Sequence, residues 1–271
     1  MGGLSDPKTN RKLLLTSYLL WPRYLTYRSR RRLRLKLQKY QLVNQPLETV
    51  SASAYKLPVI SDPNSELETK GYLFVENFLD QDSYNRLIEA WPKKRWFEPL
   101  KFGQNGKSYD SGLRWNVSKQ RVDKTIEANP EVLSIYSTLR STEFCENLTK
   151  ICNDKIERES YSLLLTQSYS HSYLTPHKDS MGTDHAKNNS IVNIIYFVQS
   201  NGNGWEAGGT SILGDATFSK PIFVPQNLNN TALIYRGAAN LWHGFPRIAR
   251  GNYRKTILSA YWMKGDSTRK S

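Results

Sequence analysis

Cysteine is scarce in this sequence, which has only Cys145 and Cys152 in 271 residues. Two cysteines cannot form the dense disulfide framework of small secreted domains, so we expect a reducing, cytoplasmic setting. Long apolar runs are missing as well, because no stretch reaches the roughly 18 residues that a membrane-spanning helix needs. The N-terminal candidate, Leu13–Trp21, is interrupted by Thr16 and Ser17. It also lacks a small-residue cleavage site, so we do not expect a signal peptide.

Acidic residues are nearly absent from residues 1–45, where Asp6 is the single acid among eleven lysines and arginines. This stretch carries ten of the fourteen net positive charges, and the rest of the chain carries the other four. Such an extension is typical of segments that dock on anionic lipid headgroups, nucleic acid or an acidic protein. Docking on lipid would make the protein peripheral at a membrane. A solvated basic tail explains the same charge, and this alternative stays open.

Composition divides the chain into three zones. Residues 1–45 are the basic extension, and residues 46–67 read as a linker or surface wrap because they contain three prolines among polar residues. Residues 68–266 combine a regular pattern of apolar residues with many aromatic residues. We therefore expect them to form one compact domain.

This domain is expected to open with one strand, to continue with helices and to end with a series of strands. A β-rich run over 71–78 precedes a helix that begins at the cap Asp80 and ends near Trp91, and a second helix is expected over 130–154. Helices followed by strands favour the α+β class. Eight strands fit a double-stranded β-helix, the jelly-roll or cupin-like core, with the N-terminal helices packed on one sheet. The eight predicted strands are 161–168, 172–177, 191–198, 209–214, 221–225, 231–236, 241–246 and 254–262.

Two of the four histidines stand in a pattern typical of metal sites. His177 and Asp179 are two residues apart at the end of a predicted strand, so their side chains point to the same side. His243, from a later strand, could complete a set of two histidines and one carboxylate, the facial triad of non-haem iron(II) oxygenases. That triad leaves three coordination positions open. The alternative for each of these three residues is an ordinary polar residue at a strand end. We expect the other two histidines, His171 and His185, to be loop residues.

Arg254 opens the last strongly β run and shares a face with Thr256. A guanidinium that points into a barrel needs an anionic partner, and it binds a carboxylate with two parallel hydrogen bonds. A hydroxyl beside it would add another hydrogen bond. We therefore predict that Arg254 and Thr256 bind a carboxylate. The alternatives are that Arg254 points outward with Lys255 or pairs with an acidic residue of the protein.

Several stretches in order resemble one known family, the 2-oxoglutarate and iron(II)-dependent oxygenases, most closely its prolyl-4-hydroxylase-like branch. The resemblance covers about 195 of the 271 residues, and the order and spacing of its motifs are more specific than any single motif. The matching stretches are the opening strand, the approach to the first two ligands, the next strand, the double-glycine turn and the turn with the last ligand: Gly71–Leu79, Tyr173–Asp179, Ile191–Val198, Trp205–Thr210 and Leu241–Gly244.

The resemblance implies a catalytic site and its cofactors. Iron(II) would bind His177, Asp179 and His243, and 2-oxoglutarate would chelate the iron as co-substrate. Arg254 would bind the far carboxylate of 2-oxoglutarate with help from Thr256. Ascorbate is a candidate reductant for the iron. A carboxylate at the Asp179 position favours hydroxylation, because family members that halogenate have a small residue there.

Three further residues are implied at the co-substrate. Tyr196 matches a tyrosine that often assists at the far carboxylate. The branch often offers another tyrosine from the strand before the two first ligands, and this sequence departs from that pattern with Gln167 followed by Tyr169. The register of that strand decides which of the two faces the iron, and simple packing of both stays open.

Three functions compete on these observations. The first is a dioxygenase that hydroxylates an unactivated C–H bond of a small molecule or a peptidyl side chain. The second keeps the chemistry but demethylates nucleic acid, although the modest charge outside residues 1–45 does not suggest the basic groove that base flipping needs. The third is a non-catalytic jelly-roll binding module, against which the complete set of ligands argues.

Overall fold

The structure is a computed structural model, and it describes residues 67, 69–99, 114–116, 135, 138–139, 141–152, 155–179, 191–237 and 241–263. The predictions for the basic extension, for residues 46–66 of the linker and for His185 lie outside this part of the chain. No helix among the described residues is long and apolar enough to cross a membrane.

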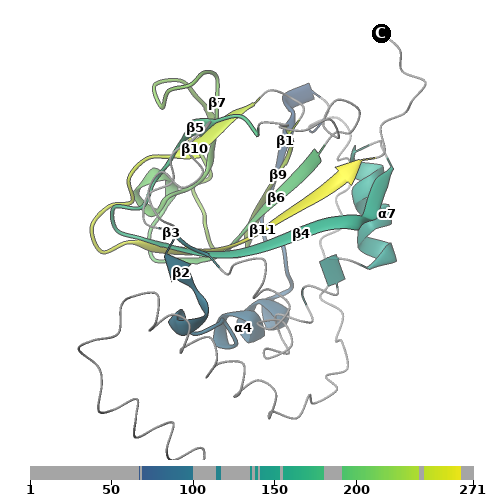
Figure 1. Ribbon diagram of the computed structural model, residues 1–271, viewed down its shortest axis with the longest axis horizontal. Helices are drawn as coiled ribbons and strands as arrows, with labels where there is room; N and C mark the ends of the chain where they lie inside the picture. Colours follow the sequence, from purple (N-terminus) through teal and green to yellow (C-terminus); the bar gives the residue numbers. More distant parts are fainter. Residues whose placement is uncertain are drawn as a thin grey trace, which may run out of the picture. The chain divides into compact units, whose positions relative to one another are not determined.

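Most described strands belong to one antiparallel sheet of seven strands (Figure 1). In spatial order it contains β1 (Tyr72–Val75), β9 (Thr231–Arg236), β6 (Ile191–Ser200), β11 (Tyr253–Met263), β4 (Ile156–Tyr169), β3 (Arg114–Asn116) and β2 (Glu98–Pro99). Neighbours in this order are far apart in the sequence, so the sheet is assembled from long-range pairs. Its central strand, β11, pairs with β6 on one side and with β4 on the other.

The other four described strands form a second antiparallel sheet. Its order is β5 (Leu174–His177), β10 (Trp242–Phe245), β7 (Ser211–Leu213) and β8 (Pro221–Phe223). In Figure 1, β5, β7 and β10 lie together on one side of the larger sheet, whereas α4 lies on the other side. Aromatic contacts join the two sheets at one edge, because the Phe223 ring lies 5.2 Å from that of Tyr72 and 5.1 Å from that of Phe74.

Strand β6, next to the central strand, is apolar on both faces because both faces are covered. On one face, Ile194, Tyr196 and Val198 belong to a core cluster that includes residues of helices α4 and α7. On the other face, Ile195 and Phe197 belong to a second cluster that includes residues of the four-stranded sheet. The larger sheet is therefore the middle layer, with helices on one side and the smaller sheet on the other.

Helix α4 begins where the sequence predicts, and helix α7 occupies the later part of the predicted span 130–154. Helix α4 (Gln81–Glu89) begins after Asp80, whose carboxylate accepts a hydrogen bond from the Ser83 N–H at 3.0 Å. Helix α7 (Thr142–Cys152) follows Ser141, whose hydroxyl accepts from the Phe144 N–H at 3.1 Å. This local cap accounts for a helix start at 142 within the predicted span 130–154.

All eight predicted strands of the second half are present; β9 has the predicted bounds, and the other seven differ in length. The largest difference is β4, which begins at Ile156 rather than at residue 161 and pairs with β11 from Met263 to Tyr253. The short strands β2 and β3 were not predicted, because two or three residues give no readable period. The antiparallel sheets and few helices fit the jelly-roll fold of the α+β prediction.

Candidate metal centre

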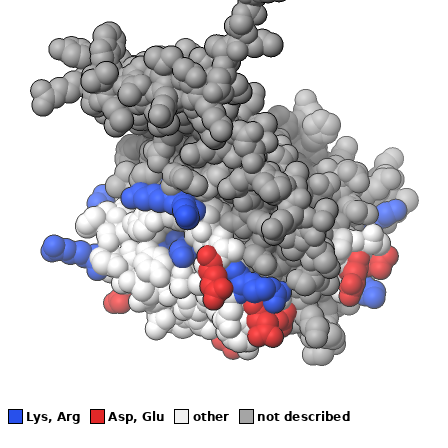
Figure 2. Space-filling model, turned by 90° about the horizontal axis from the view of Figure 1, so that it is seen from below, with Lys and Arg blue, Asp and Glu red and all other residues white. Residues whose placement is uncertain are grey.

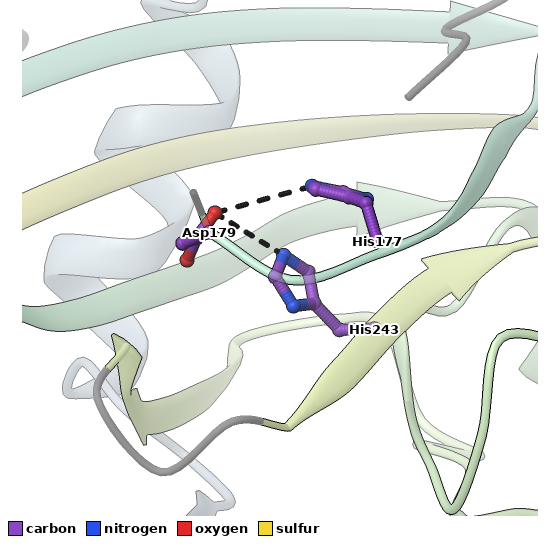
Figure 3. A group of neighbouring side chains, drawn as sticks. All are labelled: His177, Asp179 and His243. Carbon is purple, nitrogen blue, oxygen red and sulfur yellow. Dashed lines mark ion pairs between the residues drawn. The ribbon is translucent and has the colours of Figure 1, made fainter. Parts of the chain in front are cut away.

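Backbone pairing brings the three predicted ligands together. His177 ends β5 and is directly opposite His243 of β10. Asp179 stands two residues beyond the end of β5, and its Oδ1 lies 3.5 Å from Nε2 of His243 and 3.9 Å from Nε2 of His177. Figure 3 shows the carboxylate facing both rings. The three donor atoms lie within 4.8 Å of one another, close enough to bind one metal ion.

Each imidazole is oriented by a hydrogen bond from its other nitrogen. Nδ1 of His177 lies 2.9 Å from the carbonyl oxygen of Thr175, and Nδ1 of His243 lies 3.3 Å from that of Leu241. A carbonyl can only accept, so Nδ1 carries a proton in each ring, and Nε2 is the nitrogen through which each ring would bind a metal. Metal-binding histidines are commonly held in this way. Both rings are therefore set to donate through the nitrogen that faces Asp179.

A glycine permits the close approach of β5 and β10. A Cβ added at Gly244 would lie 2.6 Å from the carbonyl oxygen of Leu174 and 3.0 Å from that of Thr175. These are backbone atoms of the strand that carries His177, so they cannot move aside as a side chain could. Gly244 follows His243 directly, and its lack of a side chain lets the two histidine-bearing strands meet.

The carboxylate of Asp179 has two further partners that the sequence did not reveal. Its Oδ2 accepts hydrogen bonds from Nδ2 of Asn193 at 2.7 Å and from the hydroxyl of Tyr235 at 3.2 Å. Burial alone would raise the pKa of Asp179. The hydrogen bond and charge of His243, the charge of His177 and the hydrogen bond from Tyr235 outweigh burial, so the pKa lies below its ordinary value.

Tyr235 is a buried neutral donor. Burial raises its pKa well above the ordinary value, and the negative charge of Asp179 raises it further. Its hydroxyl also lies 3.2 Å from Nε2 of His243. The sequence contains two weak signals of this arrangement: Asn193 interrupts the otherwise apolar run of β6, and Tyr235 places a hydroxyl one residue before the end of β9. Neither signal identifies a partner.

The ligands stand at the wall of a cavity of about 210 Å³ between the two sheets. Its polar lining comes from the three ligands together with Asn193, Tyr235, Thr210, Ser259 and Arg254. Its apolar lining comes from Leu164, Leu174, Ile194, Ile195, Leu258 and Ala260. A concave site that combines apolar side chains with convergent polar groups is typical of a small-molecule pocket.

Arg254 is a buried cation in this cavity, with 2% of its surface exposed. Nη1 donates to the carbonyl of Gly208 and, at 2.9 Å, to the hydroxyl of Thr210. The guanidinium carbon lies 3.9 Å from the centre of the Phe245 ring, which holds the group in place. The alternative that Arg254 points outward beside Lys255 is therefore wrong. The buried guanidinium lines the same cavity as the three predicted ligands.

Thr256 and Tyr196 are not brought to this cavity. The hydroxyl of Thr256 lies 2.5 Å from that of Thr166, and neither residue lines the cavity. Tyr196 faces the helices, where its hydroxyl donates to Asn230 at 3.0 Å. The reason is the period of two along β6, which turns Ile195 to the cavity and Tyr196 away from it.

The register of β4 decides between Gln167 and Tyr169. Arg254 is opposite Ser168, whereas Gln167 is opposite Lys255. Lys255 lies over the ring of Trp91, on the side of the helices, so Gln167 faces that side too. Tyr169 donates a hydrogen bond to Gln167 at 2.5 Å and shares its face. Neither residue lines the cavity.

Of the two histidines expected in loops, the structure describes His171. It is exposed, has a positive φ of 68° and does not line the cavity. This matches the expectation that His171 is a loop residue.

The sequence matches no protein-family model and no curated protein. Solved structures match the fold. A prolyl-4-hydroxylase from Pseudomonas putida has 11% identity and a TM-score of 0.52, over 77% of this chain and 100% of its own. A prolyl hydroxylase from Trichoplax adhaerens, in complex with a hypoxia inducible factor peptide, has 11% identity and a TM-score of 0.53, over 85% of this chain and 92% of its own.

HygX from Streptomyces hygroscopicus, with nickel and 2-oxoglutarate bound, is similar to the same extent. It has 10% identity and a TM-score of 0.54, over 78% of this chain and 89% of its own. Identities this low establish a shared fold and nothing finer. The chain has the fold of these prolyl hydroxylases and of HygX.

Proposed function

We propose that this protein is an iron(II)- and 2-oxoglutarate-dependent dioxygenase that hydroxylates an unactivated C–H bond. The observation that carries the proposal is one cavity whose wall holds two imidazoles and a carboxylate within 4.8 Å of one another, together with a buried arginine. The sequence resemblance and the shared fold point to the same chemistry, and they do so independently of that geometry.

The donor set fits iron(II). Two imidazoles and one carboxylate form the facial triad of non-haem iron oxygenases, and the Nδ1 hydrogen bonds direct both Nε2 atoms to the metal position. His177, Asp179 and His243 would therefore hold the metal. Bound iron(II) would supply the positions at which a 2-oxo acid chelates and dioxygen is activated, and ascorbate would keep the iron reduced.

Arg254 would bind the far carboxylate of 2-oxoglutarate. A guanidinium matches a carboxylate with two hydrogen bonds, and a buried one is only weakly screened by solvent. Thr210 already accepts a hydrogen bond from Arg254 and lines the cavity, so it is placed to contact the same carboxylate. Thr256, Tyr196, Gln167 and Tyr169 are left out of this proposed site because they do not line the cavity.

A small molecule or a peptidyl side chain is the substrate class that we propose. The apolar part of the cavity wall suits a C–H bond, and the neighbours of this fold include one with a bound peptide and one with hygromycin B. A nucleic-acid demethylase would need a basic groove around its pocket. Arg254 is the only lysine or arginine among the described residues that line the cavity.

Charge on the described surface is mixed. On the face shown in Figure 2, acidic side chains lie beside basic ones. We further propose that the two sheets form a double-stranded β-helix with helices packed on one sheet, and that residues 68–266 are the catalytic domain. Binding of an anionic surface by residues 1–45 remains a prediction from the sequence.

The test is metal-dependent use of 2-oxoglutarate by the full chain. Protein purified without metal should bind 2-oxoglutarate only after iron(II) or manganese(II) is added, and with iron(II) and oxygen it should release succinate. Absence of metal-dependent binding of 2-oxoglutarate by wild-type protein would overturn the proposal. The succinate assay needs no knowledge of the substrate, because turnover without substrate also releases succinate.

A further inference from the structure

The two oxygens of the Asp179 carboxylate have different surroundings. Oδ1 faces the two histidine nitrogens, at 3.5 and 3.9 Å. Oδ2 is turned away from His177 and accepts the hydrogen bonds of Asn193 and Tyr235, at 2.7 and 3.2 Å. Oδ1 therefore faces the metal position, whereas Oδ2 accepts hydrogen bonds from other side chains of the protein.

The two donors are fixed by the larger sheet. Asn193 of β6 and Tyr235 of β9 are direct cross-strand partners, and both line the cavity. Tyr235 is buried, with 5% of its surface exposed. Asp179 itself stands beyond the end of β5, so strand pairing does not hold its side chain. The Asn193–Tyr235 pair thus supplies an orientation for the carboxylate that the ligand's own strand does not.

We propose that Asn193 and Tyr235 are positioning residues that restrict Asp179 to binding the metal through Oδ1 alone. This inference rests on the proposed function. Carboxylates bind metals through one oxygen or through both. Three protein donors leave three positions of an octahedron open, which a chelating 2-oxo acid and dioxygen fill together. A second bond from Oδ2 would take one of these three positions, in competition with the co-substrate.

Tyr235 is placed to act only as a donor to Asp179 when the metal is bound. Its hydroxyl also lies 3.2 Å from Nε2 of His243, but a nitrogen that donates its lone pair to a metal cannot accept a hydrogen bond. The carboxylate oxygen Oδ2 is then the remaining acceptor. The competing arrangement is that the phenol oxygen itself binds the metal as a fourth protein ligand.

The experiment compares affinity for the metal with affinity for the co-substrate. Full-length wild-type protein, Tyr235→Phe and Asn193→Ala are titrated without oxygen, first with manganese(II) and then, at saturating metal, with 2-oxoglutarate. In each variant we expect unchanged or tighter metal binding, because Oδ2 becomes free to coordinate. We expect 2-oxoglutarate binding to weaken about tenfold or more, since each variant removes a hydrogen bond to a charged group.

Tyr261→Phe is the matched control. Tyr261 is also a fully buried tyrosine of the larger sheet, and its hydroxyl donates to the carbonyl of Leu139 at 2.8 Å, away from the cavity. It should leave both affinities unchanged. The opposite directions expected for metal and co-substrate separate positioning from a general loosening of the site, which would weaken both.

Parallel loss of both affinities, or no change in either, in Tyr235→Phe and Asn193→Ala overturns the inference. So does a visible phenolate-to-metal absorption in the iron(III) protein that Tyr235→Phe removes, because it would make Tyr235 a ligand. The two variants remove different donors, so failure of one to fold leaves the other as the test. Wild-type protein that binds no 2-oxoglutarate with metal would instead overturn the proposed function.

Discussion

His177 and His243 are direct partners across the β5–β10 ladder, with ring centres 4.2 Å apart. Pairing of the backbone therefore sets the separation of the two imidazoles, and no loop is needed to bring them together. Gly244 allows the ladder to close at this point. The geometry of the proposed metal site thus depends on the pairing register of β5 and β10. Variants of the predicted ligands, of the strand contact and of the neighbouring residues should therefore differ in their effects on metal binding, co-substrate binding and stability.

The first prediction concerns the ligands. His177→Ala and His243→Ala should each abolish metal-dependent binding of 2-oxoglutarate and release of succinate, because two donors hold a metal poorly. Circular dichroism should remain that of the wild type. His171→Asn is the control, since His171 is exposed and asparagine tolerates its positive φ. Normal succinate release by either alanine variant would remove the assignment of that residue as a ligand.

The second prediction concerns Arg254. Removal of one partner of a buried charged pair costs about 3–5 kcal/mol, which corresponds to a loss of affinity of at least about a hundredfold. Arg254→Ala should therefore weaken 2-oxoglutarate binding by at least about a hundredfold in a calorimetric titration, while manganese(II) affinity stays close to that of the wild type.

Lys255→Met is the matched control for Arg254→Ala. Lys255 is the next residue on β11 but lies on the other side of the sheet, where its ammonium donates to Gln199 at 2.7 Å. It should leave co-substrate affinity unchanged. A change of less than about threefold in Arg254→Ala would mean that another residue holds the carboxylate.

The grouping of His177, Asp179 and His243 was predictable from the sequence, because two of the three are only two residues apart. The period of two along a strand places His177 and Asp179 on one side, and a histidine in a later strand has few alternatives in a chain with four histidines. Arg254 was predictable because a buried guanidinium in a strand needs a polar or anionic partner. The eight strands of the second half were predictable from their spacing and turn residues.

The orientation of Tyr196 was not predictable, and the physical reason is burial on both faces. A half-buried strand alternates apolar and polar residues, and that alternation reveals which residues point inward. Strand β6 is covered by helices on one face and by the second sheet on the other, so its run Ile191–Val198 is almost uniformly apolar. A shift of the strand register by one residue exchanges the two faces of the strand. The sequence contains no pattern that distinguishes the correct register from the shifted one.

The partners of Asp179 were hidden for a different reason. Tyr235 is 56 residues away in the sequence, and it meets Asp179 only because β9 pairs with β6 while β5 lies in the other sheet. A single sequence gives no access to such pairings between sheets. The same limit applies to Gly208 and Thr210, which hold Arg254 from the turn before β7.

The third prediction concerns the close approach at Gly244. Gly244→Ala places a methyl group against the backbone of β5, and overpacking of this kind costs about 1–3 kcal/mol. We expect a lower free energy of unfolding by that amount. We also expect weaker manganese(II) binding, because the strands that carry the two histidines must separate. Chemical denaturation and metal titration measure the two effects.

Gly214→Ala is the control for this strand contact. Its added Cβ would meet its nearest neighbour at 3.5 Å, an ordinary contact, at the end of β7. It should change neither stability nor metal affinity appreciably. If Gly244→Ala bound the metal as well as Gly214→Ala does, the separation of the histidines would not depend on this contact.

The fourth prediction concerns the basic extension, residues 1–45, which carries ten of the fourteen net positive charges. Replacement of Arg30, Arg31, Arg32 and Arg34 by glutamine should leave iron-dependent succinate release unchanged, because the proposed metal site needs only the two sheets and their packing helices. Any binding of the wild type to anionic vesicles should fall sharply in the variant. It should also weaken with salt, since such attraction is screened over about 8–10 Å at physiological ionic strength. Substitution is preferred to deletion because it keeps the apolar residues of the extension. Loss of succinate release in the substituted protein would place the extension within the catalytic unit and move the proposed boundary of the domain.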